Sequence, residues 1–259
     1  MKTVLRTALI SACAWLCVAF AKPATAQVAD ASSYTAYLGA EDVEKSNALW
    51  DKAVAEKQSA FDKNPKDNTV RWNLAVSQYG LLGGTMRNKD EDRFDKYYDN
   101  TKDHFEALEK DEKFKAEAKA MLSGLYGMKM AYNSMMGMVL GPKSSGLVED
   151  AVELAPNSPI VWKIQANSKM FTPAMFGGDM NESIKAYERS IELFEKQPTA
   201  LINNWLYLDT MIFLGQAYSK ESQWAKAVAI YEKALKFEPN ANWVKFQLLP
   251  KAKQKALGN

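Results

Sequence analysis

Apolar residues recur at every third or fourth position along most of this chain, which is the spacing of a buried face on an α-helix. No stretch alternates apolar and polar residues as a half-buried strand does. Clusters of glycine, proline, asparagine and aspartate separate the periodic stretches and mark helix ends. We therefore predict an all-α protein. The predicted helices cover residues 41–62, 69–82, 90–109, 114–137, 145–154, 159–171, 180–196, 201–219, 223–237 and 241–256.

One short pattern occurs three times: an alanine, a proline five residues later, and a valine five residues after that. Proline has no N–H group and its ring clashes with the preceding turn, so each helix should end near the proline. The alanine is small where two helices cross closely, and the valine lies in the first turns of the next helix. The pattern predicts a row of stacked helical hairpins. The three copies are Ala60, Pro65 and Val70; Ala151, Pro156 and Val161; and Ala234, Pro239 and Val244.

The last copy ends a longer stretch, Leu208 to Pro239, that resembles a tetratricopeptide repeat. A second unit begins at Pro159, and its central turn is lengthened around Thr172 to Gly178. The resemblance implies a right-handed α-solenoid of about four irregular helical hairpins plus capping helices, formed by residues 41–259. The residues that carry it are Leu214, Gly215, Tyr218, Trp224, Ala227, Tyr231, Ala234 and Pro239.

The first 26 residues have the pattern of a secretory signal peptide, with Lys2 and Arg6 before an apolar run and a small-residue cleavage site at Ala24-Thr25-Ala26. We expect an exported protein, periplasmic or secreted, whose residues 27–40 form a loose N-terminus. An alternative is that Ile10-Ser11-Ala12-Cys13 is a lipobox and that Cys13 carries a lipid anchor, but the apolar run before Cys13 is short for that.

Cleavage at this site would change the charge and the chemistry of the chain. It removes three basic residues and no acidic one, so the balance moves from 33 basic against 31 acidic to 30 against 31. The net charge falls from +2 to −1, which does not indicate a nucleic-acid-binding surface. Both cysteines, Cys13 and Cys17, also lie in the leader, which excludes disulfides and thiolate chemistry from the remainder.

Candidate catalytic and metal-binding residues have simpler structural explanations. His104 is the only histidine and falls at a buried-type position, so we predict that it packs in the core and that the protein is not an enzyme. Asn88, Asp90 and Asp92 are spaced like the first ligands of a calcium loop but lack its glycine and final glutamate. Gly141 to Gly146 lacks the ending of a phosphate loop and is predicted to be a connector. We expect no cofactor and no metal.

Methionines crowd residues 121–138, where thioethers could bind Cu(I) or line an adaptable apolar groove. Their three-four spacing favours a third interpretation, a buried helix face that belongs to the core. The stripe consists of Met121, Leu125, Met128, Tyr132, Met135 and Val139.

One pattern bears on binding. The tetratricopeptide resemblance implies that Lys163 and Asn167 lie one turn apart on the concave face, where relatives grip a peptide carboxylate. Phe213 stands at the matching position of the next unit, so a complete clamp is absent, while Asp209 and Gln216 are expected on the same side. These four residues are the predicted contacts with a protein or peptide partner.

We therefore predict an exported helical-repeat scaffold or adaptor that binds a protein or peptide on its concave face. The alternative is a solute-binding accessory component of an envelope transporter with an apolar pocket. It follows from a looser similarity of the Phe176-Gly177-Gly178-Asp179 turn to helical-repeat partners of bacterial solute transporters. An open groove at Lys163 and Asn167 would favour the scaffold, and a deep pocket lined by the methionines would favour the transporter component.

Overall fold

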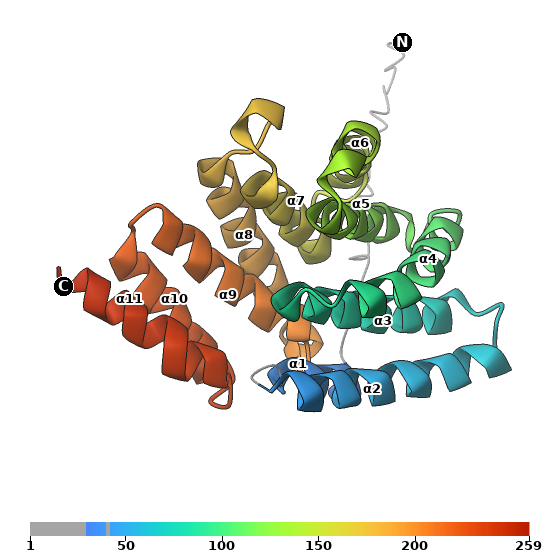
Figure 1. Ribbon diagram of the computed structural model, residues 1–259, viewed down its shortest axis with the longest axis horizontal. Coiled ribbons are helices and arrows are strands. Elements are labelled where there is room, and N and C mark those ends of the chain that lie inside the picture. Colours follow the sequence, from blue (N-terminus) through green and yellow to red (C-terminus); the bar gives the residue numbers. More distant parts are fainter. Residues whose placement is uncertain (1–29, 40–41, 259) are drawn as a thin grey trace, which may run out of the picture.

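The computed structural model describes residues 30–39 and 42–258, and every regular element within these ranges is helical (Figure 1). The predicted signal peptide, residues 1–26, lies outside the described residues. The α-helices are α1 (Ala31–Leu38), α2 (Val43–Lys63), α3 (Asn68–Asn88), α4 (Glu91–Leu108), α5 (Lys115–Tyr132), α6 (Gly137–Leu154), α7 (Pro159–Phe171), α8 (Met180–Glu195), α9 (Trp205–Lys220), α10 (Trp224–Phe237) and α11 (Leu249–Ala256). The shorter elements are the 3₁₀ turns η1 (Ser134–Met136), η2 (Ala174–Phe176) and η3 (Pro198–Leu201) and the π-helical segment η4 (Val244–Leu248).

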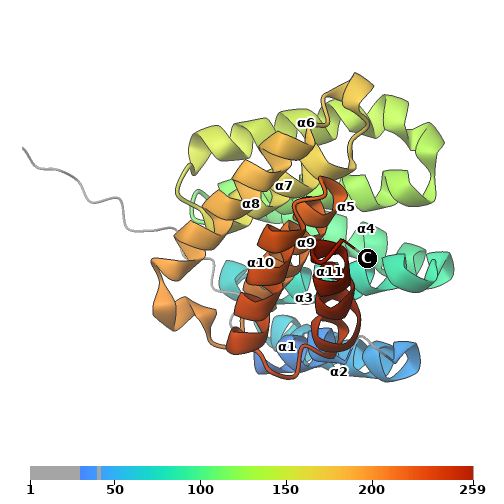
Figure 2. The same ribbon diagram turned by 90° about the vertical axis from the view of Figure 1, so that its left-hand side faces the viewer.

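The helices stack as hairpins into a right-handed α-solenoid, which confirms the predicted fold class (Figures 1 and 2). Within the described residues, four hairpins form the stack: α3–α4, α5–α6, α7–α8 and α9–α10. The helices α1 and α2 lie at one end and α11 at the other. Each hairpin buries one face against its neighbours, so a single apolar core runs along the row.

The repeated alanine–proline–valine joint forms as predicted. The helices α2, α6 and α10 end at Lys63, Leu154 and Phe237, each two residues before the proline of its joint. In the two later joints the alanine and valine are fully buried, whereas the first joint, near the end of the stack, is only partly covered. The joint therefore marks the place where one hairpin passes to the next.

Part of the N-terminal segment differs from its expectation, because Ala31–Leu38 form a packed helix within the stretch 27–40 that was predicted to be loose. The side chain of Asp30 accepts hydrogen bonds from the backbone N–H groups of Ser32 and Ser33 and caps α1. Tyr34 and Tyr37 are each only 9% exposed. Burial of two aromatic side chains supplies the apolar contact that orders this short helix, which sequence periodicity over so few residues could not show.

Two helix ends were also placed wrongly. The helix predicted over 114–137 ends at Tyr132, because Asn133 is extended and its side chain accepts from the N–H of Met135. The connector predicted at 141–146 is instead part of α6, with Pro142 inside the helix. Ser123 and Ser144 hold α6 against α5: the Ser123 hydroxyl donates to the Ser144 carbonyl at 2.8 Å, and the Ser144 hydroxyl donates to the Ser123 carbonyl at 3.0 Å.

Two glycines allow aromatic rings to lie directly on a helix backbone. A Cβ atom at Gly80 would be 2.3 Å from the ring of Trp50, and one at Gly215 would be 2.2 Å from the ring of Tyr231. Trp50 and Tyr231 are 3% and 1% exposed, so neither ring can move aside without disturbing the core. At both positions the aromatic ring therefore fills the space that a side chain would take.

We predict that Gly215→Ala destabilises the fold by about 1–3 kcal/mol, because the added methyl group overlaps the Tyr231 ring. The matched control is Gly127→Ala in α5, where nothing lies within 4 Å of the new methyl group. That variant should be neutral or more stable by about 0.5–1 kcal/mol through helix propensity. Urea unfolding of both variants checks this, and equal behaviour of the two would contradict the packing argument.

His104 packs in the core, as predicted. Its ring is 5% exposed and meets the ring of Phe61 edge-on at 5.0 Å. The guanidinium of Arg71 lies 3.3 Å from Nδ1 of His104, and the other ring nitrogen, Nε2, has no hydrogen bond. Two effects lower the pKa of His104 to about 4: burial, which is the larger, and the positive charge of Arg71. The imidazole is therefore neutral in the folded protein at neutral pH.

This pKa predicts an acid sensitivity. The unfolded chain has a His104 pKa near 6.5, so between pH 6.5 and 4 it binds a proton that the folded protein does not bind. The free energy of unfolding should therefore fall as the pH drops through this window, by about 2–3 kcal/mol in all. Thermal unfolding of the native chain and of His104→Gln at several pH values measures it. His104→Gln should lack this pH-dependent loss of stability. Identical pH profiles of the two proteins would show that His104 does not cause it.

Candidate functional site

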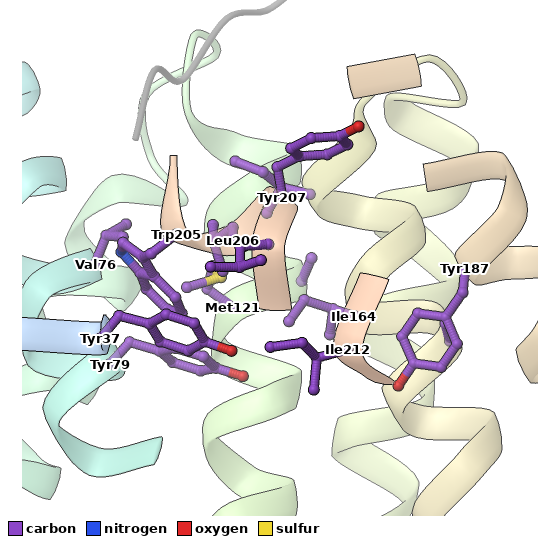
Figure 3. Packing of buried hydrophobic residues seen from close by; sticks show 14 of the residues in the cluster. Tyr37, Val76, Tyr79, Met121, Ile164, Tyr187, Trp205, Leu206, Tyr207 and Ile212 are labelled. Atoms are coloured by element: carbon purple, nitrogen blue, oxygen red, sulfur yellow. The ribbon is translucent and has the colours of Figure 1, made fainter. Parts of the chain in front are cut away.

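The interior of the solenoid's curve is occupied by aromatic side chains from distant parts of the chain. The helix α1 contacts α9 as well as α2 and α3, and so joins the two ends of the row. Tyr37 stacks on Trp205 with ring centroids 5.7 Å apart, and Trp50 meets Trp205 edge-on at 5.9 Å. Figure 3 shows Tyr37, Tyr79 and Trp205 on one side of Ile212 and Tyr187 on the other. Much of the predicted concave groove is therefore filled.

A buried ion pair lies within this interior. The Nζ atom of Lys163 on α7 is 2.7 Å from Oδ2 of Asp209 on α9. The side chains are 2% and 12% exposed. The hydroxyl of Tyr37 on α1 donates to the other carboxylate oxygen at 2.8 Å. Burial, and then the Asp209 charge, raise the pKa of Tyr37 well above its ordinary value, so the phenol stays protonated and keeps donating.

This geometry changes the interpretation of Lys163. The prediction treated its ammonium as free to grip a partner's carboxylate, but in the structure Asp209 already holds it. A contact with a partner would require this ion pair to break, and that would leave a buried carboxylate unpaired. No repeat-position signal pointed to the pair, because Lys163 is the fifth residue of the unit that begins at Pro159 and Asp209 is the second residue of the unit that begins at Leu208.

Asn167 and Gln216 lie nearer the surface than the ion pair. The Tyr187 hydroxyl donates to Oδ1 of Asn167 at 2.6 Å, which fixes the amide. Gln216 is partly exposed, and its buried Nε2 atom has no hydrogen-bond partner. Of the four predicted contact residues, Lys163 and Asp209 therefore form an ion pair. Asn167 and Gln216 lie at the border of the same surface and are not bonded to each other.

Phe213 connects the buried ion pair to the exposed surface. Its ring stacks on Tyr187 at 6.4 Å, and the Lys163 ammonium lies 5.5 Å from its centroid. Phe171, at the end of α7, is 59% exposed and meets Phe213 edge-on at 5.8 Å. The ammonium of Lys220 lies 5.5 Å from the Phe171 ring. Sequence reasoning missed Phe171, Tyr187 and Lys220, because none of them stands out without the fold.

We call this surface the α7–α9 face and define it by five residues. Its chemistry is two aromatic rings, two amides and one ammonium group, which can recognise apolar and hydrogen-bonding groups. It presents no nucleophile with an adjacent base. The residues are Asn167, Phe171, Phe213, Gln216 and Lys220.

The methionine segment is divided between core and surface. Met121 is fully buried and Met128 is partly buried, as the core interpretation predicts. Met135 and Met138 are 84% and 89% exposed. The prediction of a continuous buried stripe is wrong beyond Tyr132, because α5 ends there and the following turn points its side chains outward.

The other candidates are also located by the structure. Asp90 of the calcium-like stretch caps α4 by accepting from the N–H of Arg93 at 3.1 Å. Among the described residues, no group of three His, Cys, Asp or Glu side chains could hold a metal ion. In the same residues, no helix is long and apolar enough to cross a membrane.

A shallow cleft of about 20 Å³, which is room for about one water molecule, opens where α1 and α3 meet the last helices. The guanidinium of Arg87 lies 5.5 Å from the Trp243 ring at its edge. None of its lining residues comes from the methionine segment, so it is not the pocket that the transporter alternative requires. The lining residues are Tyr37, Leu38, Arg87, Leu208, Ile212, Ala241, Asn242, Trp243 and Val244.

Comparison with known proteins supports the repeat at the C-terminal end. Residues 208–241 match the tetratricopeptide repeat family. This repeat holds Asp209, Phe213, Gln216 and Lys220, so one side of the α7–α9 face belongs to it. A search of the curated proteins finds no match.

Two solved structures match this chain at low sequence identity. BtubC (BKLC) from P. vanneervenii is 16% identical over 83% of this chain and 84% of its own, with a TM-score of 0.46. Yeast Tom70 is 13% identical over 83% of this chain and 60% of its own, with a TM-score of 0.21. Both TM-scores are below 0.5, so no property of either protein is transferred to this chain.

The buried ion pair makes a prediction about stability. Lys163→Met or Asp209→Leu alone should lower the free energy of unfolding by about 3–5 kcal/mol, because each leaves a buried charge unpaired. The double variant should be more stable than the sum of the two costs implies, since no charge remains. Urea unfolding of the three variants and the native chain gives the coupling energy. Strictly additive costs would show that the two side chains do not form this pair in solution.

Proposed function

We propose that this protein is an exported helical-repeat scaffold that binds a protein or peptide partner on its α7–α9 face. The observation that carries the proposal is the exposed Phe171 ring, held against Phe213 and beneath the Lys220 ammonium. Aromatic side chains that are exposed yet fixed in position are typical anchors of protein interfaces. The pattern of residues 1–26 supports export to a periplasmic or secreted location.

The four predicted contact residues have different parts in this proposal. Asn167 and Gln216 are both partly exposed and lie at the border of the surface that meets the partner. Lys163 and Asp209 lie beneath the face and hold the Phe213 ring and the two helices in place. Rigid support of this kind reduces the entropy lost on binding.

This surface favours recognition over catalysis. The only histidine of the sequence is buried beside Phe61, and the five residues of the face include no imidazole, carboxylate, hydroxyl or thiol. Solenoids of stacked hairpins present extended surfaces of this kind to other chains. No observation favours the transporter component. The methionines that would line its pocket run instead from the core to an exposed turn.

The test is site-specific photo-crosslinking in envelope extract from the source cell, with a photoreactive phenylalanine in place of Phe171. Phe246 is the matched control, because it is also exposed, at 65%, and also lies beneath a lysine, with Lys245 at 5.3 Å. We expect one protein to be crosslinked through position 171 and not through position 246.

The affinity of that partner, once purified, should depend on the same contacts. Phe171→Ser combined with Lys220→Glu should weaken binding by about tenfold or more, and Phe246→Ser with Lys245→Glu should leave it unchanged. Calorimetry measures both. The proposal fails if the two positions crosslink the same set of proteins, or if both pairs of substitutions weaken binding alike.

A further inference from the structure

Polar side chains tie the start of α1 to the two helices at its own end of the row. The carboxylate of Asp30, which caps α1, pairs with the Lys57 ammonium on α2 at 2.9 Å. The hydroxyl of Ser33 lies 2.7 Å from the hydroxyl of Ser77 on α3. Figure 1 shows α1 beside α2. These contacts fix the first turn of α1 against the N-terminal part of the solenoid.

Two tyrosine hydroxyls tie the same helix to the C-terminal part of the row. Tyr34 donates to the carboxylate of Glu238, directly after α10, at 2.8 Å. Tyr37 donates to Asp209 on α9 at 2.8 Å, and its ring lies on Trp205 (Figure 3). Burial, and then the neighbouring carboxylates, raise the pKa of both phenols, so the hydroxyls stay protonated and keep donating. The helix α1 therefore spans the interior from one end of the row to the other.

This helix lies where a bound peptide would lie in an open stack of hairpins. Such stacks leave a concave face, and a short amphipathic helix can bind in a groove by laying one face into it. The four buried residues of α1 share one face of the helix, because they are spaced one, three and four positions apart. They are Ser33, Tyr34, Ala36 and Tyr37.

The helix α1 is too short to be stable on its own. It has eight residues, and isolated helices shorter than about 12–15 residues are marginal in water. Its order therefore depends on the contacts that it makes with the groove beneath it. Segments of this kind open locally at a smaller cost in free energy than the unfolding of the whole protein.

The charged groups that α1 binds would not be left unpaired if the helix moved away. An unpaired buried charge would make that movement costly. Here each of the three charged partners of α1 also has a contact outside α1, so the solenoid beneath stays satisfied. The retained contacts are Asp209 with Lys163 at 2.7 Å, Glu238 with the N–H of Asn240 at 2.9 Å, and Lys57 with Glu56 at 3.0 Å.

We propose that the groove beneath α1 is a second binding site and that α1 is its internal, displaceable ligand. The partner that fits is a short helix with an acidic N-terminal cap and two tyrosine hydroxyls three residues apart. Lys57, Glu238 and Asp209 would bind these groups as they bind those of α1. This site is distinct from the α7–α9 face, so the inference goes beyond the proposed function.

The first test measures the local opening of α1 in residues 27–259, which contain every described residue and have no cysteine. Ala36→Cys places one thiol in α1, and Ala120→Cys places one in α5 as the matched control, since both alanines are fully buried. With dithionitrobenzoate, position 36 should react at least about 100-fold faster, because α1 opens without wider unfolding. Thermal unfolding confirms that both variants are folded.

The second test removes the two hydroxyl ties. Tyr34→Phe with Tyr37→Phe keeps both rings and should speed the reaction of Ala36→Cys by about tenfold or more. The matched control is Tyr207→Phe with Tyr218→Phe, which removes two hydroxyl–carboxylate bonds outside α1. It should leave the reaction at position 36 unchanged.

The third test uses a dye-labelled peptide of residues 30–39 as the probe for the groove. The tethered α1 competes with it at an effective concentration of about 1 mM. In fluorescence anisotropy, the peptide should therefore bind the Tyr34→Phe/Tyr37→Phe chain at least about tenfold more tightly than the native chain. A peptide that itself carries both substitutions should bind that chain about tenfold more weakly, because it lacks both hydroxyl donors.

Each test has an outcome that would overturn the inference. Equal reaction rates at positions 36 and 120 would show that α1 opens only when the whole fold opens. Equal acceleration by the two double variants would show that the hydroxyls of α1 are not specific ties. Absence of peptide binding, or equal binding of the two peptides, would make α1 a structural helix and not a ligand. No protein partner is present in these experiments, so their failure leaves the proposed function untouched.

Discussion

The ion pair between Lys163 and Asp209 is the contact on which the interior of this solenoid depends. It ties α7 to α9, and the Tyr37 hydroxyl ties α1 to the same carboxylate. A buried charge is tolerated only when it is paired and hydrogen-bonded, so all three helices must hold their places together. Apolar packing alone could tolerate small shifts between hairpins, whereas this network specifies one arrangement.

Packing around this network relies on residues that are small or flat. Gly80 and Gly215 bring the rings of Trp50 and Tyr231 onto helix backbones, and Gly124 takes the Tyr79 hydroxyl in the same way. A methyl group at Gly80 or Gly215 would overlap an aromatic ring, and one at Gly124 would overlap the Tyr79 hydroxyl. The rings in turn fill the inside of the curve, which is why the open groove expected of a stack of hairpins is reduced to the α7–α9 face.

The two exposed surfaces derive from this interior. Because Phe213 is held between Tyr187 and the Lys163 ammonium, Phe171 rests on a fixed support and remains exposed. Because α5 and α7 run in the same direction, the turns that follow them lie at the same side of the molecule. One surface is a fixed aromatic face, and the other is a pair of turns with exposed apolar side chains.

The sequence by itself determined the all-α class, the hairpin joints and the burial of His104, because helical period and proline chemistry act over a few residues. Only the tertiary structure decided that Lys163 is held by Asp209, that Met135 lies outside the core and that α1 is ordered. These outcomes depend on which distant segments meet: the hydrogen bond between Tyr37 and Asp209 joins residues 172 positions apart. No local sequence pattern predicts such a long-range contact, since it forms only when the stacked hairpins bring the two ends of the row together.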